Sequence, residues 1–163
     1  MKIYKYPTFI ILLILVIICC YLLVDHFKEK KELNESLKTA SILDYYRKQV
    51  IEKGDIKSYS ELQFEYDNSD NFLFVALIMS NKYNYQEAYY DVFYCLTRYS
   101  NKNKLEALDD MDQTTKTMAL DYLKQGALKG NPDCKQILGK FYIQGKYLGK
   151  DIQKGNKLLL EAN

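Results

Sequence analysis

Residues 130–155 read GNPDCKQILGKFYIQGKYLGKDIQKG, and this stretch decides the fold. Gly139 permits close contact between two helices, and Gly145 can take the left-handed conformation that ends a helix. Asp151 stands where it can cap a second helix, whose buried side we assign to residues 158–160. The stretch therefore predicts two short antiparallel helices joined by a tight turn.

A matching pattern of small residues occurs twice in this part of the chain. Ala119 and Gly155 are 36 residues apart, as are Gly126 and Ala162. In both segments one small residue precedes the other by seven positions, as in LDYLKQGA and NKLLLEAN. Small residues on one helical face let a neighbouring helix approach closely. The pattern indicates a repeat of stacked helix pairs.

These residues resemble the Sel-like repeat, a short relative of the tetratricopeptide repeat. The resemblance is clearest over residues 117–163 and departs from the family at Tyr147, where a second turn glycine is common. It implies an all-α fold, a short α-solenoid of antiparallel helix pairs. The matching residues are Gly130, Asn131, Cys134, Leu138, Gly139, Tyr142, Gly145, Leu148, Asp151, Lys154 and Gly155.

Upstream of residue 117 the resemblance is weaker. Residues 88–96 align with residues 134–142 only if about ten extra residues occupy the turn near residues 101–112. We therefore expect one repeat with a short turn, one with a stretched turn, and a degenerate unit at residues 72–79. Because stacked units need several neighbours for stability, the preceding helix is expected to act as a cap.

Apolar periodicity predicts the remaining elements. A helix over residues 27–53 should end at Gly54, and its apolar stripe comprises Leu33, Leu37, Ala40, Leu43, Tyr46 and Val50. The stripe is expected to pack on the repeat domain, the alternative being that it binds a partner or self-associates. We assign residues 27–66 to this amphipathic helix and a linker, and residues 67–163 to the Sel-like helical repeat domain.

Within that domain, a helix is predicted over residues 86–99 and a loop or irregular helix over residues 100–115. The turn-rich residues 67–71 should cap the helix that follows them.

The N-terminal segment has the composition of a membrane span. Residues 8–24 read TFIILLILVIICCYLLV without a charge, which is about 25 Å of helix. We therefore assign residues 1–26 to an N-terminal tail and one transmembrane helix. An uncleaved anchor is favoured because no A-x-A cleavage pattern is present, while a lipoprotein or a cleaved signal peptide are the alternatives.

Positive charge flanks both ends of this segment, so orientation depends on the size of the two sides. A short basic tail stays in the cytoplasm, whereas a long C-terminal domain is translocated largely regardless of charge. In the bacterial setting that the resemblance implies, we expect a single-pass protein of the inner membrane with a periplasmic C-terminal domain.

Charge and cysteine usage argue against two classes of site. The 23 basic and 21 acidic residues give a formal charge of +2, too balanced for a protein that binds nucleic acid through its phosphates. Cys95 and Cys134 lack the spacing of a metal or disulfide framework, and we expect them to be buried.

No motif in the chain carries catalytic chemistry. His26 is the only histidine, so histidine-dependent triads have no second member. The glycine-rich turn at residues 145–151 lacks the spacing of a phosphate-binding loop, and residues 109–112 lack the glycine and glutamate of a calcium loop. We therefore expect no enzyme, no cofactor and no metal. The alternative, an enzyme, would place its site at residues 59–70.

The leading hypothesis is a membrane-anchored protein–protein interaction module, because stacked helices offer a surface and no reactive group. The resemblance brings in bacterial immunity proteins that bind secreted toxins, and the alternative is a structural or regulatory adaptor subunit of a membrane complex. Since Tyr and Arg often anchor interfaces, we expect the partner to dock on the first-helix face of the repeats. Packing of the tyrosines beneath the stretched turn is the alternative. The predicted partner-binding residues are Tyr90, Tyr94, Arg98, Gln136 and Lys140.

Overall fold

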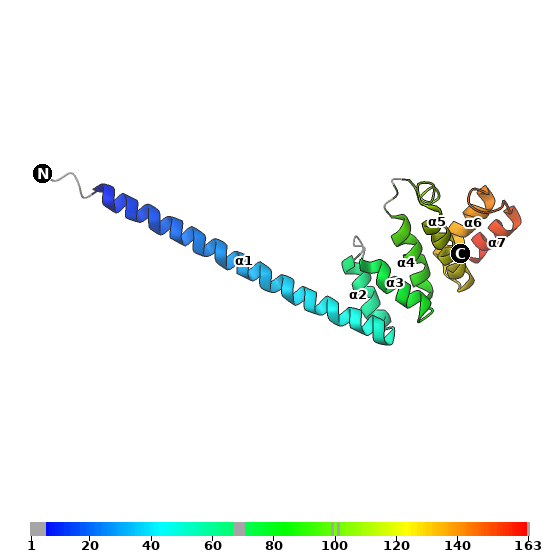
Figure 1. The fold of residues 1–163 in the computed structure, drawn as a ribbon, viewed down its shortest axis with the longest axis horizontal. Coiled ribbons are helices and arrows are strands. Elements are labelled where there is room, and N and C mark those ends of the chain that lie inside the picture. Colours follow the sequence, from blue (N-terminus) through cyan, green and yellow to red (C-terminus); the bar gives the residue numbers. More distant parts are fainter. Residues whose placement is uncertain (1–5, 67–70, 99, 101, 163) are drawn as a thin grey trace. The chain divides into compact units, whose positions relative to one another are not determined.

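The protein is all-helical over the residues that its computed structural model describes, which are 6–66, 71–98, 100 and 102–162. Side chains are described at residues 15, 17–65, 72–98, 100 and 102–162. These residues form seven α-helices and no strand, which confirms the predicted all-α class. The helices in Figure 1 are α1 (Tyr6–Lys53), α2 (Ile56–Tyr66), α3 (Asn71–Asn81), α4 (Gln86–Thr97), α5 (Gln113–Leu128), α6 (Pro132–Gln144) and α7 (Ile152–Glu161).

The chain divides into two compact units, residues 1–45 and 46–163. The division falls within α1 and within the predicted 27–66 segment. Burial along the apolar stripe explains its position, since Leu37 is exposed whereas Val50 is fully buried. The second unit begins where the stripe becomes covered, and Gly54, with φ of +65°, ends the helix as predicted.

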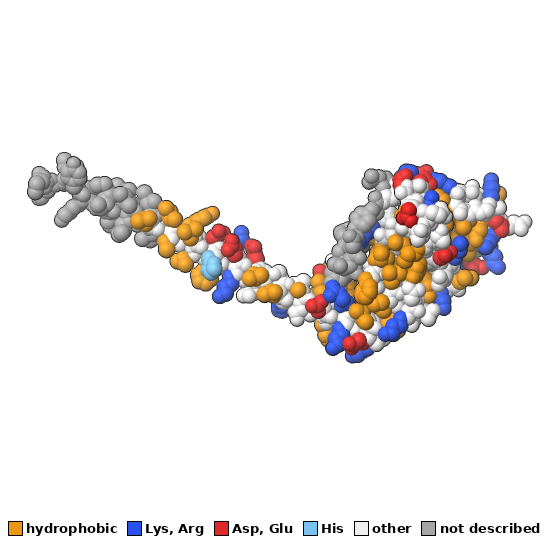
Figure 2. Space-filling view, viewed as in Figure 1, with side chains coloured by type: hydrophobic (Ala, Val, Ile, Leu, Met, Phe, Trp, Pro, Cys, Tyr) orange, Lys and Arg blue, Asp and Glu red, His pale blue; other side chains and the backbone are white. Residues whose placement is uncertain are grey.

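In the described part of the chain, no helix is long and apolar enough to cross a membrane. The predicted anchor at residues 1–26 lies partly outside the described residues, because residues 1–5 and the side chains at 6–14 and 16 are not among them. Figure 2 shows the hydrophobic side chains of the described part of α1, with charged side chains following them. Those exposed near its start include Leu15, Ile17, Ile18, Leu22, Leu23 and Val24.

In the second unit each helix from α2 to α7 packs on the next one in the chain, and α4 also contacts α6. Figure 1 shows α2 at one end of this unit and α7 at the other. Buried apolar side chains occur on every helix from α2 to α6 and at the end of α1. A core cluster lies among α4, α5, α6 and the segment before α5. Its buried members are Tyr89, Phe93, Leu108, Ala119, Leu120, Leu123, Ala127, Cys134, Ile137, Leu138 and Phe141.

Helices α6 and α7 form an antiparallel pair that meets at two glycines. A Cβ on Gly139 would lie 2.9 Å from the carbonyl oxygen of Gly155, and one on Gly155 would lie 2.7 Å from that of Gly139. Gly145 ends α6 at φ of +69°, and the Asp151 side chain caps α7 by accepting the Lys154 N–H at 2.9 Å. The predicted roles of these glycines and of the cap are confirmed.

One packing prediction for α7 is wrong. Leu160 was assigned to its buried side, but 78% of this residue is exposed. Leu158 and Leu159 are half-buried and take the inward positions. Leu160 lies about 100° further around the helix and so faces solvent.

The segment predicted as a linker contains a helix. The Asp55 carboxylate accepts the Ser58 N–H at 2.8 Å, so Asp55 caps the start of α2. Tyr59 and Leu62 are buried one turn apart, and the Tyr59 ring lies 5.2 Å from that of Phe72. Of the turn predicted at residues 67–71, residues 67–70 lie outside the described residues, and Asn71 is the first residue of α3.

Candidate functional site

The predicted partner-binding residues belong to α4, with Arg98 directly after its end, and to α6, and these two helices contact each other in the second unit. Local sequence fixes where α6 starts: Pro132 occupies its first turn, and the buried Asn131 side chain accepts the Cys134 N–H at 2.8 Å. Of the five predicted residues, Gln136 is exposed, whereas Tyr90, Tyr94, Arg98 and Lys140 are half-buried. The structure therefore brings the two helices together but leaves their side chains unequally accessible.

Lys104 lies against both tyrosines of the predicted site. Its ammonium group donates to the Tyr90 hydroxyl and lies 5.2 Å from the centroid of that ring and 5.8 Å from that of Tyr94. The hydrogen bond to Tyr90 is the main reason that the pKa of Lys104 is raised, and Asp133 at the start of α6 adds to it. Tyr90 also packs on the core. The stretched turn thus covers part of the tyrosine face.

The segment between α4 and α5 is fixed by a buried part and by a polar cluster. Ala107 and Leu108 are buried in it. The Asp109 carboxylate accepts hydrogen bonds from Lys146 Nζ at 2.8 Å and from the Tyr147 hydroxyl at 2.6 Å. These two hydrogen bonds lower the pKa of Asp109 to about 2. Tyr147, where the chain departs from the Sel-like pattern, therefore joins the stretched turn to the α6–α7 turn.

A buried polar cluster links α2 to α4, in the region named for the alternative enzyme site. The Tyr59 hydroxyl donates to Asp91 Oδ2 at 2.7 Å, and Gln63 Nε2 donates to Asp91 Oδ1 at 3.1 Å. Burial, and then the Asp91 charge, raise the pKa of Tyr59, so its hydroxyl keeps its proton. Only 1% of Tyr59 is exposed, so this group is out of reach of a substrate and holds two helices together.

The cysteines of the second unit are buried as predicted. Burial raises the pKa of the Cys134 thiol to about 12, with a smaller contribution from the charges of Asp133 and Asp91. A protonated thiol is a poor nucleophile and a poor metal ligand. Among the described residues, no group of three or more His, Cys, Asp or Glu side chains is arranged to hold a metal ion.

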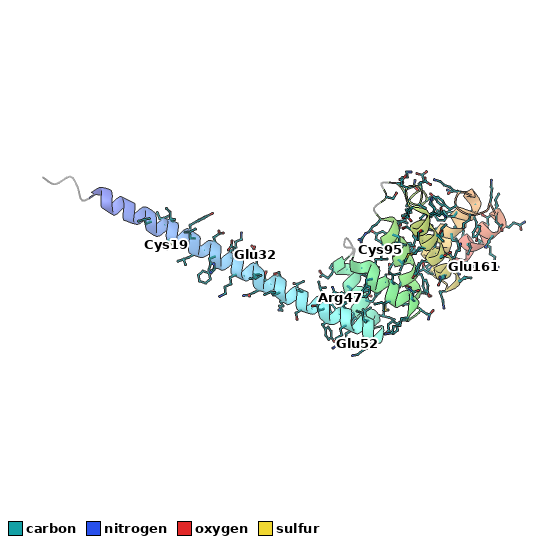
Figure 3. The ribbon with its side chains drawn as sticks, viewed as in Figure 1. Cys19, Glu32, Arg47, Glu52, Cys95 and Glu161 are labelled. Atoms are coloured by element: carbon teal, nitrogen blue, oxygen red, sulfur yellow. The ribbon has the colours of Figure 1, made fainter. Side chains whose placement is uncertain are left out.

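A groove that sequence reasoning missed lies over α6, between α5 and α7. Its volume is about 390 Å³. The apolar lining is Ala127, Leu138 and Leu158, with Leu128 on α5, and the charged lining is Lys124, Lys135, Lys154 and Glu161 (Glu161 is labelled in Figure 3). Three lysines against one glutamate make the groove basic. The lysines come from three different helices, so no local pattern in the sequence marks them.

Comparisons of this chain with family models, with curated proteins and with solved structures find no match. The Sel-like resemblance of residues 117–163 stays a prediction.

Proposed function

We propose that this protein is a protein-binding module of Sel-like repeat type and not an enzyme. The observation that carries the proposal is the α6–α7 pair, which closes on the contact between Gly139 and Gly155. The packing of each helix from α2 to α7 on the next one supports it further, because a short α-solenoid is built in this way. Such a fold offers a continuous surface to a partner.

The first-helix face is the proposed docking surface. Gln136 and Lys140 lie one turn apart on α6 and so share a helical face. Tyr94, Arg98 and Lys104 extend this surface from α4 and the stretched turn. Tyr90 lies at the edge of this surface, where it packs on the core and its hydroxyl accepts a hydrogen bond from Lys104.

We further propose that residues 1–26 hold the protein at a membrane, with residues 46–163 on the periplasmic side. The charge-free run at residues 8–24 and the exposed apolar side chains along the described part of α1 support this placement. A C-terminal fusion that gives an active cytoplasmic reporter and an inactive alkaline phosphatase would contradict it.

An anchored binder without a reactive group suits an immunity protein that neutralises a secreted toxin. The exposed stripe of α1, which includes Leu33 and Leu37, favours a second candidate, an adaptor subunit of a membrane complex. Another helix could cover such a stripe within a complex. The identity of the captured partner separates the two candidates.

Partner capture tests the docking surface directly. The full chain is crosslinked in its native membrane and its partners are identified by mass spectrometry. Gln136→Ala with Lys140→Ala should reduce recovery of the partner about tenfold, with the melting temperature nearly unchanged. Gln125→Ala with Lys129→Ala is the matched control, since it removes the same two residue types at exposed positions outside this face. Equal recovery with both double variants would place the binding surface elsewhere.

A further inference from the structure

The two ends of the second unit carry surfaces of opposite character. At the α7 end, the groove over α6 combines an apolar floor with Lys124, Lys135 and Lys154. Leu128 lines it and is 87% exposed, so an apolar side chain stands in solvent beside the lysines. An exposed apolar surface bordered by charge is typical of an interaction site.

The lysines of the groove have partners that a ligand can replace. Lys124 pairs with Asp121 at 3.4 Å, three residues earlier on the same helix, and Lys135 pairs with Glu161 at 3.3 Å. Lys154 donates to the hydroxyl of Tyr142 at 2.8 Å. An exposed pair such as that of Lys124 and Asp121 contributes little to stability, so re-pairing of Lys124 with an incoming carboxylate has a small cost.

At the other end, α2 exposes an aromatic ring beside two carboxylates. Phe64 is 84% exposed, although Tyr59 and Leu62 on the same helix are buried. Glu61 and Glu65 lie three residues before and one residue after Phe64. At 100° per residue both fall on the same side of the ring. Together they form an apolar and acidic surface.

We propose that copies of this chain bind one another head to tail, with Phe64 of one copy inserted in the groove of the next. The ring contacts Leu138, Leu158 and Leu128, while Glu61 and Glu65 pair with the lysines of the groove. Aromatic side chains seated in an apolar groove and surrounded by charge pairs are the usual anchors of protein interfaces. The charge complementarity between Glu61 and Glu65 at one end and the lysines of the groove at the other identifies a second copy as the occupant.

The two surfaces belong to opposite ends of a row of helices, so they do not meet within one copy. Each helix from α2 to α7 packs on its neighbour in the chain, with α2 first and α7 last. Contacts between different surfaces of identical chains extend into open assemblies unless the geometry closes a ring. Self-association is therefore expected to continue beyond a dimer, and it does not depend on the partner of the first-helix face.

The experiment is sedimentation equilibrium of the full chain in a density-matched detergent over a range of concentrations. The unmodified chain should increase in mass with concentration beyond two copies. Phe64→Ser alone, and Lys124→Glu with Lys154→Glu, should each give monomers. Mixing these two variants should restore a dimer and nothing larger, because one retains the groove and the other retains the ring.

Matched controls separate this interface from general changes in charge or hydrophobicity. Phe74→Ser removes another exposed ring, 55% accessible on α3, and should leave association intact. Lys116→Glu with Lys150→Glu makes the same change in net charge away from the groove and should also leave it intact. A monomeric unmodified chain, association that persists in both interface variants, or a mixture that stays monomeric would each overturn the proposal.

Discussion

Two of the connections between helices in the second unit, α6–α7 and α4–α5, are held by different means. Between α6 and α7 the chain turns within residues 145–151, where Gly145 takes a left-handed conformation and the Asp151 N–H donates to the Tyr142 carbonyl at 2.9 Å. Between α4 and α5 it runs through residues 98–112, where Leu108 is buried and Asp109 binds Lys146 and Tyr147. A short turn is stabilised by local backbone geometry, and a long one needs contacts from distant side chains.

This difference makes the α4–α5 connection part of the buried core through Leu108, whereas Tyr147 and Leu148 of the α6–α7 turn pack against that core from partly buried positions. Leu108 packs with residues of α4, α5 and α6, so the long segment joins helices of both predicted repeats. Its polar cluster also links it to the turn of the following pair. Loss of the long segment should therefore loosen several helices together, whereas damage to the short turn should act mainly on α7.

The largest loss of stability is expected from Leu108→Ala. Leu108 is fully buried, so its truncation leaves a cavity and should lower the free energy of unfolding by about 2–5 kcal/mol. Urea unfolding followed by circular dichroism measures the loss. Leu128→Ala, at an exposed position, should change stability by less than about 0.5 kcal/mol. If the two substitutions cost the same, the long segment is not part of the core.

Overpacking of the α6–α7 pair should cause the next largest loss of stability. In Gly139→Leu the new side chain meets the Gly155 carbonyl oxygen and the Leu159 side chain, at a cost of about 1–3 kcal/mol. Gly149→Leu is the control, because a Cβ at Gly149 has nothing within 4 Å. An unchanged melting temperature for Gly139→Leu would contradict the close contact of the two helices.

The same contrast explains which parts of the fold could be predicted from the sequence. The α6–α7 pair was predictable because Gly139, Gly145 and Asp151 act through short-range contacts and caps. The burial of Leu108 could not be predicted from the sequence, since no periodic pattern marks one leucine within a polar connection. The helix α2 was missed for a related reason: its cap, Asp55, and its buried Tyr59 resemble ordinary loop residues until α3 and α4 cover them.

The predicted site shows the same limit. The exposure of Gln136 followed from its position between packing residues of α6. The position of Tyr90 beneath Lys104 could not be predicted from the sequence, because this contact depends on the path of the stretched turn. The basic groove was missed because Lys124, Lys135 and Lys154 come together only after three helices have packed.

The smallest effect is expected from the polar cluster at Asp109, and it should depend on pH. The pKa of this carboxyl is about 2 in the folded protein, below its usual value of 3.8, because Lys146 and Tyr147 donate to it. A group whose pKa is lowered by folding stabilises the fold fully above the unfolded pKa and loses that contribution as pH falls through the folded one. Asp109 should therefore stabilise the fold above about pH 4, and its contribution should decline toward pH 2.

Comparison of the unmodified chain with Asp109→Asn isolates this contribution, since every other carboxyl titrates in both proteins. The urea midpoint of the variant should be lower at neutral pH, and the two midpoints should converge as pH approaches 2. Lys146→Met should reduce the pH-dependent part of the stability in the same way. It removes the hydrogen bond that contributes most to the lowered pKa of Asp109. Asp121→Asn, at an exposed carboxyl on α5, is the control for the removal of a carboxylate. A constant difference between the unmodified chain and Asp109→Asn from pH 2 to pH 7 would mean that the long connection is held by Leu108 without help from the charged cluster.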